Sequence, residues 1–357
     1  MNEIPYSLTE RLLHNFAFSL KPFQIALADF EDQLWKREIR DQSLAPPVFI
    51  TSLPRAGTTL LLNNLAQLEE MASHTYRDMP FLLAPILWDR LSRRFRQKAV
   101  SQERAHADGM QVDFDSPEAF EEIIWQTFWK KKYTQACIKA IGEEENNSYF
   151  KEFFVQHMKK IGWLRGIKSQ NNCYLSKNNA NINRIAYLHK NFPEARILIP
   201  FRNPVDHAQS LLRQHMRFRD MHQRYPFSRK YMAHLGHFEF GQLHKPLEFS
   251  DMEELSHYDS ETIEYWLTYW RLAFKDVLAH LKTSQVALVS FDALRSEPES
   301  GLKRIAHYLN LSDTKRLVEM ASIYTPPKEQ EKDLDCDPGC LQVAQELYND
   351  LQSASIV

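Results

Sequence analysis

A short segment, Phe49–Leu62, contains the residues whose types and spacing best suit the binding of an anion. An apolar run at its start predicts a buried strand, and Thr58–Leu68 predicts a helix, so a loop joins the two. The unpaired N–H groups and the dipole at a helix start attract an anion. Gly57 lets the backbone approach a ligand closely, and Arg55 adds positive charge. The segment therefore predicts a phosphate cradle, which is made of Arg55, Ala56, Gly57, Thr58, Thr59 and Leu60.

The cradle differs from the loop of nucleotide triphosphatases, whose pattern is G-x-x-x-x-G-K-S/T. The first glycine of that pattern is missing here, and Thr58 stands where the pattern has its lysine. Because that lysine contacts the β- and γ-phosphates, its absence disfavours ATP. A P-loop kinase acting on a small molecule remains an alternative reading of the loop. A catalytically inactive nucleotide-binding module is a second alternative.

A second strand–loop–helix junction follows later in the chain, at Ile197–Ser210. Pro204 suits the first position of a helix, and Arg202 stands at the carboxyl end of the predicted strand. Ligands bind at that end of the strands in open parallel sheets. An arginine there can form bidentate, charge-assisted hydrogen bonds with a phosphate. This junction therefore predicts a second phosphate site.

With both junctions in view, the sequence resembles sulfotransferases that use 3′-phosphoadenosine 5′-phosphosulfate. The stretch Pro54–Leu60 is similar to their 5′-phosphosulfate loop, most closely in bacterial sulfotransferases and the tyrosylprotein branch. Arg202-Asn203-Pro204 and Ser210 match the family's pattern for the 3′-phosphate. The likeness covers roughly residues 47–82 and 172–312. It implies transfer of a sulfuryl group from this nucleotide to a hydroxyl or amine of an acceptor, by in-line displacement and without a metal.

The resemblance also implies roles in catalysis. Lys177 matches the family's catalytic lysine, which would neutralise charge at the bridging oxygen. Relatives carry a histidine or glutamate base shortly after the first helix, and the expected glutamate is missing here. If this window is strand-like, His74 and Asp78 share one face, and we expect either to be the base. Arg77 is better suited to holding an acidic acceptor or the sulfonate.

The pattern of the whole chain predicts an α/β fold, in which a parallel sheet is flanked by helices. The predicted inner strands are 48–50, 173–175, 196–199 and 286–289, and 71–76 is a further candidate. Helices are predicted over residues 7–40, with a break at Pro22, and over Glu261–Leu281. We expect a single P-loop-like sulfotransferase domain over residues 1–357. It would have an N-terminal helical segment (1–45) and two helical insertions (80–165 and 205–285) that shape the acceptor site.

Composition limits the possible partners. The 357 residues carry a net charge of -2, so no overall basic field indicates a nucleic-acid partner. The four cysteines are too few for a disulfide framework, and no signal peptide or membrane-spanning run is evident. These features predict a cytoplasmic protein. The acceptor is left open among small molecules, glycans, lipids and peptides, and so is the oligomeric state.

Two other polar groups stand out. A basic run is typical of a solvated helix face, with an anion-attracting role as the minor alternative; it comprises Arg90, Arg93, Arg94, Arg96 and Lys98. The stretch 231–244 combines histidines with aromatic residues at a spacing that does not suit a metal; they are Tyr231, His234, His237, Phe238, Phe240 and His244. We regard this stretch as a candidate lining of an acceptor pocket, or a lid.

Overall fold

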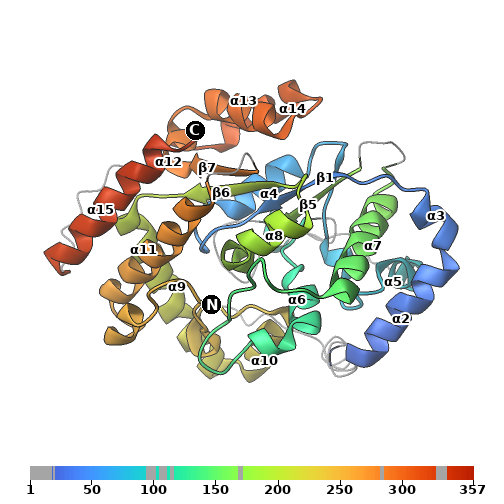
Figure 1. The fold of residues 1–357 in the computed structure, drawn as a ribbon, viewed down its shortest axis with the longest axis horizontal. Helices are drawn as coiled ribbons and strands as arrows, with labels where there is room; N and C mark the ends of the chain where they lie inside the picture. The colour runs from blue at the N-terminus through green and yellow to red at the C-terminus, as the bar shows by residue number, and fades with distance from the viewer. Residues whose placement is uncertain are drawn as a thin grey trace.

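The computed structural model describes residues 18, 21–93, 102–103, 111–112, 116–167, 172–281, 285–326 and 336–357. Within them, the central feature is a sheet of five parallel strands in the order β2-β5-β1-β6-β7 (Figure 1). Its strands are β1 (Ala45–Ile50), β2 (Met71–Ala72), β5 (Cys173–Lys177), β6 (Arg196–Phe201) and β7 (Val286–Ser290). A short antiparallel pair, β3 (Gln102–Glu103) and β4 (Gln111–Val112), lies outside this sheet. The α/β fold with a parallel sheet is confirmed.

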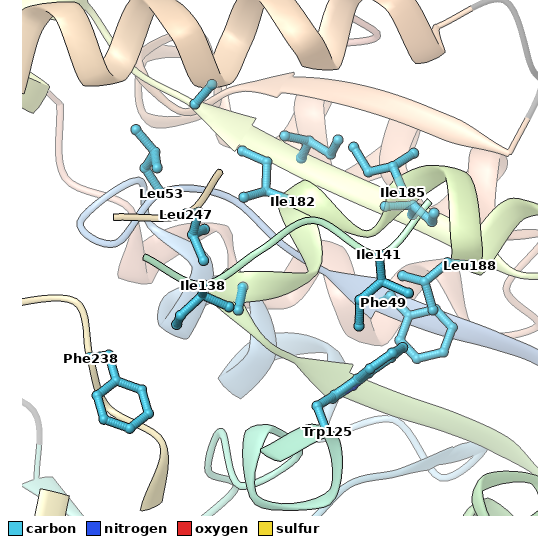
Figure 2. Close-up of a cluster of buried hydrophobic side chains, with 14 of the residues drawn as sticks. Phe49, Leu53, Trp125, Ile138, Ile141, Ile182, Ile185, Leu188, Phe238 and Leu247 are labelled. Atoms are coloured by element: carbon cyan, nitrogen blue, oxygen red, sulfur yellow. The ribbon is translucent and has the colours of Figure 1, made fainter. Parts of the chain in front are cut away.

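Both faces of the sheet are buried, because alternate residues of each strand point to opposite sides. In β1, Phe49 belongs to one apolar cluster, whereas Val48 and Ile50 belong to the other. Tyr174 and Leu175 divide in the same way in β5. Figure 2 shows part of the larger cluster, in which Phe49 lies near the side chains of neighbouring helices. Because both faces are packed, the sheet holds in place the strand ends at which the loops after β1 and β6 begin.

Helices cover the two faces (Figure 1). The face with Val48 and Ile50 packs against α4 (Thr58–Leu65), α12 (Phe291–Ser296), α13 (Pro298–Leu309) and α14 (Thr314–Glu319). The larger cluster on the other side contains residues of seven helices: α6 (Glu122–Phe128), α7 (Ser148–Leu164), α8 (Ile185–Asn191), α9 (Pro204–Arg224), α10 (Pro226–Leu235), α11 (Ile263–His280) and α15 (Pro338–Ser353). Near its edge lie α2 (Lys21–Leu34), α3 (Lys36–Arg40) and α5 (Pro85–Ser92).

The four predicted inner strands are all present, and each extends one to three residues beyond its predicted bounds. The candidate strand 71–76 is wrong beyond Ala72, because Tyr76–Asp78 forms a 3-10 helix. A capping box explains the change: the N–H of Thr75 donates to Asp78 Oδ2 at 2.9 Å, which favours a helical turn over an extended chain. The predicted strand face shared by His74 and Asp78 therefore does not form.

The helix predicted over 7–40 is described only in part. Pro22 stands in the first turn of α2, where the N–H groups have no partner within the helix, so proline is tolerated there. Residues 7–17 lie outside the described ranges. Of the basic run, Arg90 and Arg93 are exposed, Arg93 pairs with Asp89, and the other three members lie outside the described residues. The predicted insertions carry α5 to α7 and α9 to α11.

Candidate active site

The loop between β1 and α4 has a backbone that only particular residues tolerate. Arg55 has φ 71° and Gly57, which caps α4, has φ 90°, so both lie in the left-handed region. A Cβ atom on Gly57 would lie 2.3 Å from a ring carbon of Phe291. Glycine is therefore needed at this position for both its conformation and its size. The N–H groups at the start of α4 are thereby left open to the space in front of the loop.

The second predicted phosphate segment meets this loop. Arg202 Nη1 donates to the carbonyl oxygen of Arg55 at 3.2 Å, and Arg55 Nε donates to Ser210 Oγ at 3.4 Å. The side chain of Asn203 caps α9 by accepting from the N–H of Val205 at 3.0 Å. The sequence-predicted residues Arg55, Arg202 and Ser210 are thus brought together, although about 150 residues separate the two segments.

Arg202 and His207, where the two segments meet, differ in charge. The Nε atom of Arg202 is buried and has no hydrogen-bond partner within the described residues, and burial lowers the pKa of the guanidinium. Beside it, His207 donates from Nε2 to the carbonyl oxygen of Pro54 at 2.7 Å. Burial, together with the charge of Arg202, lowers the pKa of His207 to about 3, so this imidazole stays neutral. Arg202 itself lines the cleft in front of this loop, so its guanidinium borders the space that an anion would enter.

An open cleft with a cavity volume of about 230 Å³ lies in front of the cradle. Its lining includes Arg55, Gly57, Thr58, Thr59, Leu60, Lys177, Arg202, Phe240 and Phe291. Lys177 is the last residue of β5 and lies opposite Ile50 of β1, so the sheet carries it to the edge where the cradle begins. The structure therefore brings the predicted lysine to the predicted cradle. Ala56 and Ser210 are not among these lining residues, but Ser210 accepts a hydrogen bond from Arg55, which is one of them.

A second, narrower pocket, with a cavity volume of about 30 Å³, adjoins the cleft. Five residues line both spaces: Pro54, Lys177, Asn179, His237 and Glu239. Glu239 accepts from Asn179 Nδ2 at 3.3 Å, and its Oε2 lies 3.6 Å from His237 Nδ1. Burial by itself would raise the pKa of Glu239, but His237 and the charge of Lys177 outweigh it and lower the pKa to about 2. An ionised carboxylate therefore stands beside the lysine where the two spaces meet.

The predicted base residues occupy a different place. His74 and Asp78 are buried, and His74 Nε2 lies 3.2 Å from His157 Nε2. Asp78 pairs with Arg165 and lies 3.4 Å from His74 Nδ1. Burial acts to raise the pKa of Asp78, but Arg165 and His74 together lower it. Within the described residues, His74, Asp78 and Arg77 do not line the cleft or the adjoining pocket.

Three residues at the site were not predicted from the sequence to bind the donor or to take part in catalysis. Glu118 lines the donor-side cleft and accepts from the hydroxyl of Tyr76 at 2.6 Å, but no pattern in the sequence marks it. His237 belongs to the histidine and aromatic stretch that we noted, which is the only signal for it. Glu239 follows it closely, between two phenylalanines, and reaches the site because η5 (Gly241–Leu243) packs this segment against α9.

Within the described ranges, no three His, Cys, Asp or Glu side chains are grouped so that they could hold a metal ion. None of the helices there is both long enough and apolar enough to cross a bilayer.

The α/β fold, a parallel sheet flanked by helices, matches that of sulfotransferase structures, and comparison of the sequence agrees. The model of the sulfotransferase family matches residues 46–315, and the chain belongs to this family. Membership implies a transferase with 3′-phosphoadenosine 5′-phosphosulfate as its co-substrate. No curated protein sequence gives a significant match. The closeness to the tyrosylprotein branch stays a prediction.

Solved structures of bacterial sulfotransferases are similar to this chain. Sulfotransferase STF9 from Mycobacterium avium aligns with 90% of this chain and 80% of its own, at 14% identity and a TM-score of 0.53. Sulfotransferase STF1 from Mycobacterium tuberculosis H37Rv covers 92% and 81%, at 10% identity and a TM-score of 0.45. A sulfotransferase from Alicyclobacillus acidocaldarius covers 87% and 92%, at 14% identity and a TM-score of 0.41.

Proposed function

We propose that this protein transfers the sulfuryl group of 3′-phosphoadenosine 5′-phosphosulfate to a hydroxyl, or an amine, of an acceptor. The observation that carries the proposal is the meeting of Arg202 and Ser210 with the cradle through Arg55. A nucleotide with phosphates at both ends of its ribose needs two anion sites close together. A cradle at one strand end and an arginine at the neighbouring strand end meet that need.

The residues of the cleft fit the donor. The N–H groups at the start of α4, with Thr58 and Thr59, would hold the 5′-phosphosulfate, since no side chain at Gly57 blocks their approach. Arg202, which lines the cleft, would hold the 3′-phosphate with its guanidinium, and Ser210 would add a hydroxyl. Phe240 and Phe291 line the same cleft and offer aromatic faces to a purine. Each part of the nucleotide thereby has a partner of suitable chemistry.

The transfer itself needs positioning and neutralisation of charge more than covalent help from the protein. The acceptor oxygen forms a bond to sulfur while the bond between sulfur and the oxygen of the 5′-phosphate breaks. Adenosine 3′,5′-bisphosphate leaves, and the negative charge that develops on its bridging oxygen is stabilised by Lys177. The proton of the acceptor hydroxyl must go to a base in reach of both spaces.

We assign that base to His237, with Glu239 as its partner. Both line the cleft and the adjoining pocket, beside Lys177. Imidazole is the side chain best suited to accept a proton near neutral pH, whereas a carboxylate with a pKa of about 2 is a poor acceptor. Glu239 would orient the ring and stabilise its charged form. His74 and Asp78 remain the alternative from the sequence, but their burial and the ion pair with Arg165 weigh against them.

Calorimetric titration with three nucleotides tests the donor site. We expect adenosine 3′,5′-bisphosphate to bind more tightly than AMP or ATP. Arg202→Ala should lower the affinity for the bisphosphate by roughly tenfold to a hundredfold, which is what the loss of charge-assisted hydrogen bonds costs. It should leave the affinity for AMP nearly unchanged. Arg224→Ala, at the far end of α9, is the matched control. Equal loss for both nucleotides would contradict a 3′-phosphate site at Arg202.

The titration, together with a transfer assay that uses labelled donor, separates the alternatives. A P-loop kinase would prefer ATP with Mg²⁺ over the bisphosphate. A binding module without catalysis would bind the bisphosphate but form no sulfated product from labelled donor. Formation of a labelled product by the unmodified protein, and its loss in Arg55→Ala, would exclude both.

A further inference from the structure

The neighbouring strands β6 and β7 end level with each other. Their register pairs Phe201 with Ser290, which are the last residues of the two strands. Because neighbouring strands lie close together, the residues just beyond these two ends meet. There, Asp292 Oδ2 accepts from the N–H of Asn203 at 2.8 Å. Arg202 therefore stands next to a backbone group that Asp292 holds.

Asn203 joins this contact to the helix that follows. Its side-chain oxygen accepts from the N–H of Val205 at 3.0 Å and so caps α9, the helix that carries Ser210. The N–H that Asp292 holds belongs to the planar peptide group between Arg202 and Asn203. A hydrogen bond to this group fixes the direction of that plane. It thereby restrains the backbone from which the side chain of Arg202 begins.

The charges around Arg202 give Asp292 a second effect. Burial lowers the pKa of Arg202, the carboxylate of Asp292 raises it, and the charges of Arg295 and Arg213 lower it. Like charges repel a guanidinium, whereas an opposite charge attracts it. Asp292 therefore offsets the repulsion that two neighbouring arginines exert on Arg202.

Asp292 is itself held by the C-terminal helix. Tyr348 of α15 is buried, and its ring meets that of Phe201 edge-on, with 5.8 Å between the ring centres. The hydroxyl of Tyr348 hydrogen-bonds with Asp292 and Ser290. Burial, together with the charge of Asp292, raises the pKa of Tyr348 to about 12, so the hydroxyl keeps its proton. A protonated hydroxyl can donate to the carboxylate and fix its orientation.

Residues 354–357, which follow α15, attach this helix to β7. Ser355 Oγ accepts from the N–H of Ser290 at 3.2 Å. The N–H of Ile356 donates to the carbonyl oxygen of Leu288 at 3.0 Å. Both contacts lie on β7, close to its carboxyl end. They help to keep Tyr348 beside the strand ends where Asp292 and Asn203 meet.

We propose that Asp292, oriented by Tyr348, is a positioning residue that fixes Arg202 for the 3′-phosphate of the donor. This inference rests on the proposed function and extends the 3′-phosphate site to α12 and α15. A carboxylate near a phosphate repels it, so Asp292 improves binding only through the arginine. The alternative is a role confined to α12, because Asp292 stands in the first turn of that helix, where a negative charge is stabilising.

The affinity for adenosine 3′,5′-bisphosphate divided by that for AMP, both measured by calorimetry, reports the contribution of the 3′-phosphate. We expect Asp292→Ala to lower this ratio by roughly tenfold or more, because a displaced arginine loses bonds to the phosphate. A role confined to α12 would lower the melting temperature and leave the ratio unchanged. Simple repulsion of the phosphate would make the ratio rise. Either of these two results overturns the inference.

Asp292→Asn is the conservative variant. It keeps an oxygen that can accept from the N–H of Asn203, and it loses only the counter-charge. We expect its ratio to return to within about threefold of the wild-type value, since most of the effect comes from the hydrogen bond. A loss in Asp292→Asn as large as that in Asp292→Ala would contradict the positioning of the backbone.

Tyr348→Phe tests the support from α15, since it removes only a hydroxyl. We expect the ratio to fall by roughly threefold to tenfold, which corresponds to the loss of one hydrogen bond. Tyr308→Phe is the matched control, because the Tyr308 hydroxyl donates to the carbonyl oxygen of Gln285, before the other end of β7. Its ratio should stay within about twofold of the wild-type value. Equal effects in the two tyrosine variants would overturn the role of Tyr348.

The ratio in the unmodified protein separates failure of this inference from failure of the proposed function. If the unmodified protein binds the bisphosphate no more tightly than AMP, the 3′-phosphate site and the role of Asp292 both fall. If it prefers the bisphosphate and Asp292→Ala keeps that preference, only the role of Asp292 falls.

Discussion

The cradle glycine offers the most direct test of the donor site. Gly57→Ala would force an alanine to φ 90°, which costs about 1–2 kcal/mol relative to glycine. Its Cβ would also meet the Phe291 ring at 2.3 Å, where ordinary contact begins near 3.4 Å, so the ring or the loop must shift by roughly 1 Å. Because Gly57 and Phe291 both line the donor cleft, this shift should disturb a hydrogen bond to the charged nucleotide, worth about 1.5–3 kcal/mol, so we expect the affinity for adenosine 3′,5′-bisphosphate to fall by roughly tenfold to a hundredfold.

Calorimetry of the bisphosphate, with thermal melting of each variant, separates binding from folding. Gly166→Ala is the matched control, because Gly166 has φ 75° but no atom within 4 Å of the added Cβ. Gly166→Ala should lower the melting temperature without lowering the affinity for the nucleotide. Combining Gly57→Ala with Phe291→Ala should recover part of the loss, since the collision is removed and the dihedral cost remains. A wild-type affinity in Gly57→Ala would refute the reasoning. So would a double variant whose loss of binding free energy equals the sum of the losses in the two single variants.

Three more predictions concern the catalytic groups and pH. Lys177→Ala should lower kcat for sulfate transfer by roughly 100- to 1,000-fold with a much smaller effect on bisphosphate binding, and a loss under tenfold would remove Lys177 from catalysis. His237→Gln should lower kcat by roughly 100-fold or more, because the amide cannot accept the acceptor's proton; an unchanged kcat would point to another base. His207 has a folded pKa of about 3 against an ordinary 6.5, so its stabilising contribution is complete above pH 6.5 and is lost as the pH falls. Between pH 7 and pH 5 the wild-type protein should lose about 2 kcal/mol of stability that His207→Gln does not lose, as measured by urea unfolding at both pH values.

The sequence predicted the parts of the site that depend on local pattern. A strand, a turn and a helix start are adjacent in the chain, so the cradle at Arg55 and the junction at Arg202 were both recognisable, and so was the lysine at the end of β5. Sheet order then brought these strand ends together, since β1 lies between β5 and β6. Their predicted roles in binding and catalysis stay predictions until the variants are measured.

The region around the acceptor was harder to predict, because it depends on contacts between distant segments. Glu239 reaches Lys177 only through the path of the chain between α10 and η5, and nothing in its neighbours indicates a functional carboxylate. The window after the first helix misled us for a local reason, since the capping box at Thr75 and Asp78 replaced the expected strand. The burial of His74 against His157 likewise depends on α7, far away in the sequence.

The residues that the cleft and the pocket share have a thermodynamic consequence. Donor and acceptor would both meet Lys177, His237 and Glu239, so a ligand in one space changes the electric field and the hydrogen bonds available in the other. Any such effect is reciprocal: the factor by which adenosine 3′,5′-bisphosphate changes acceptor affinity equals the factor by which the acceptor changes nucleotide affinity. An acceptor affinity is therefore defined only for a stated occupancy of the nucleotide site. Screening for acceptors with the bisphosphate present and absent would measure this coupling directly.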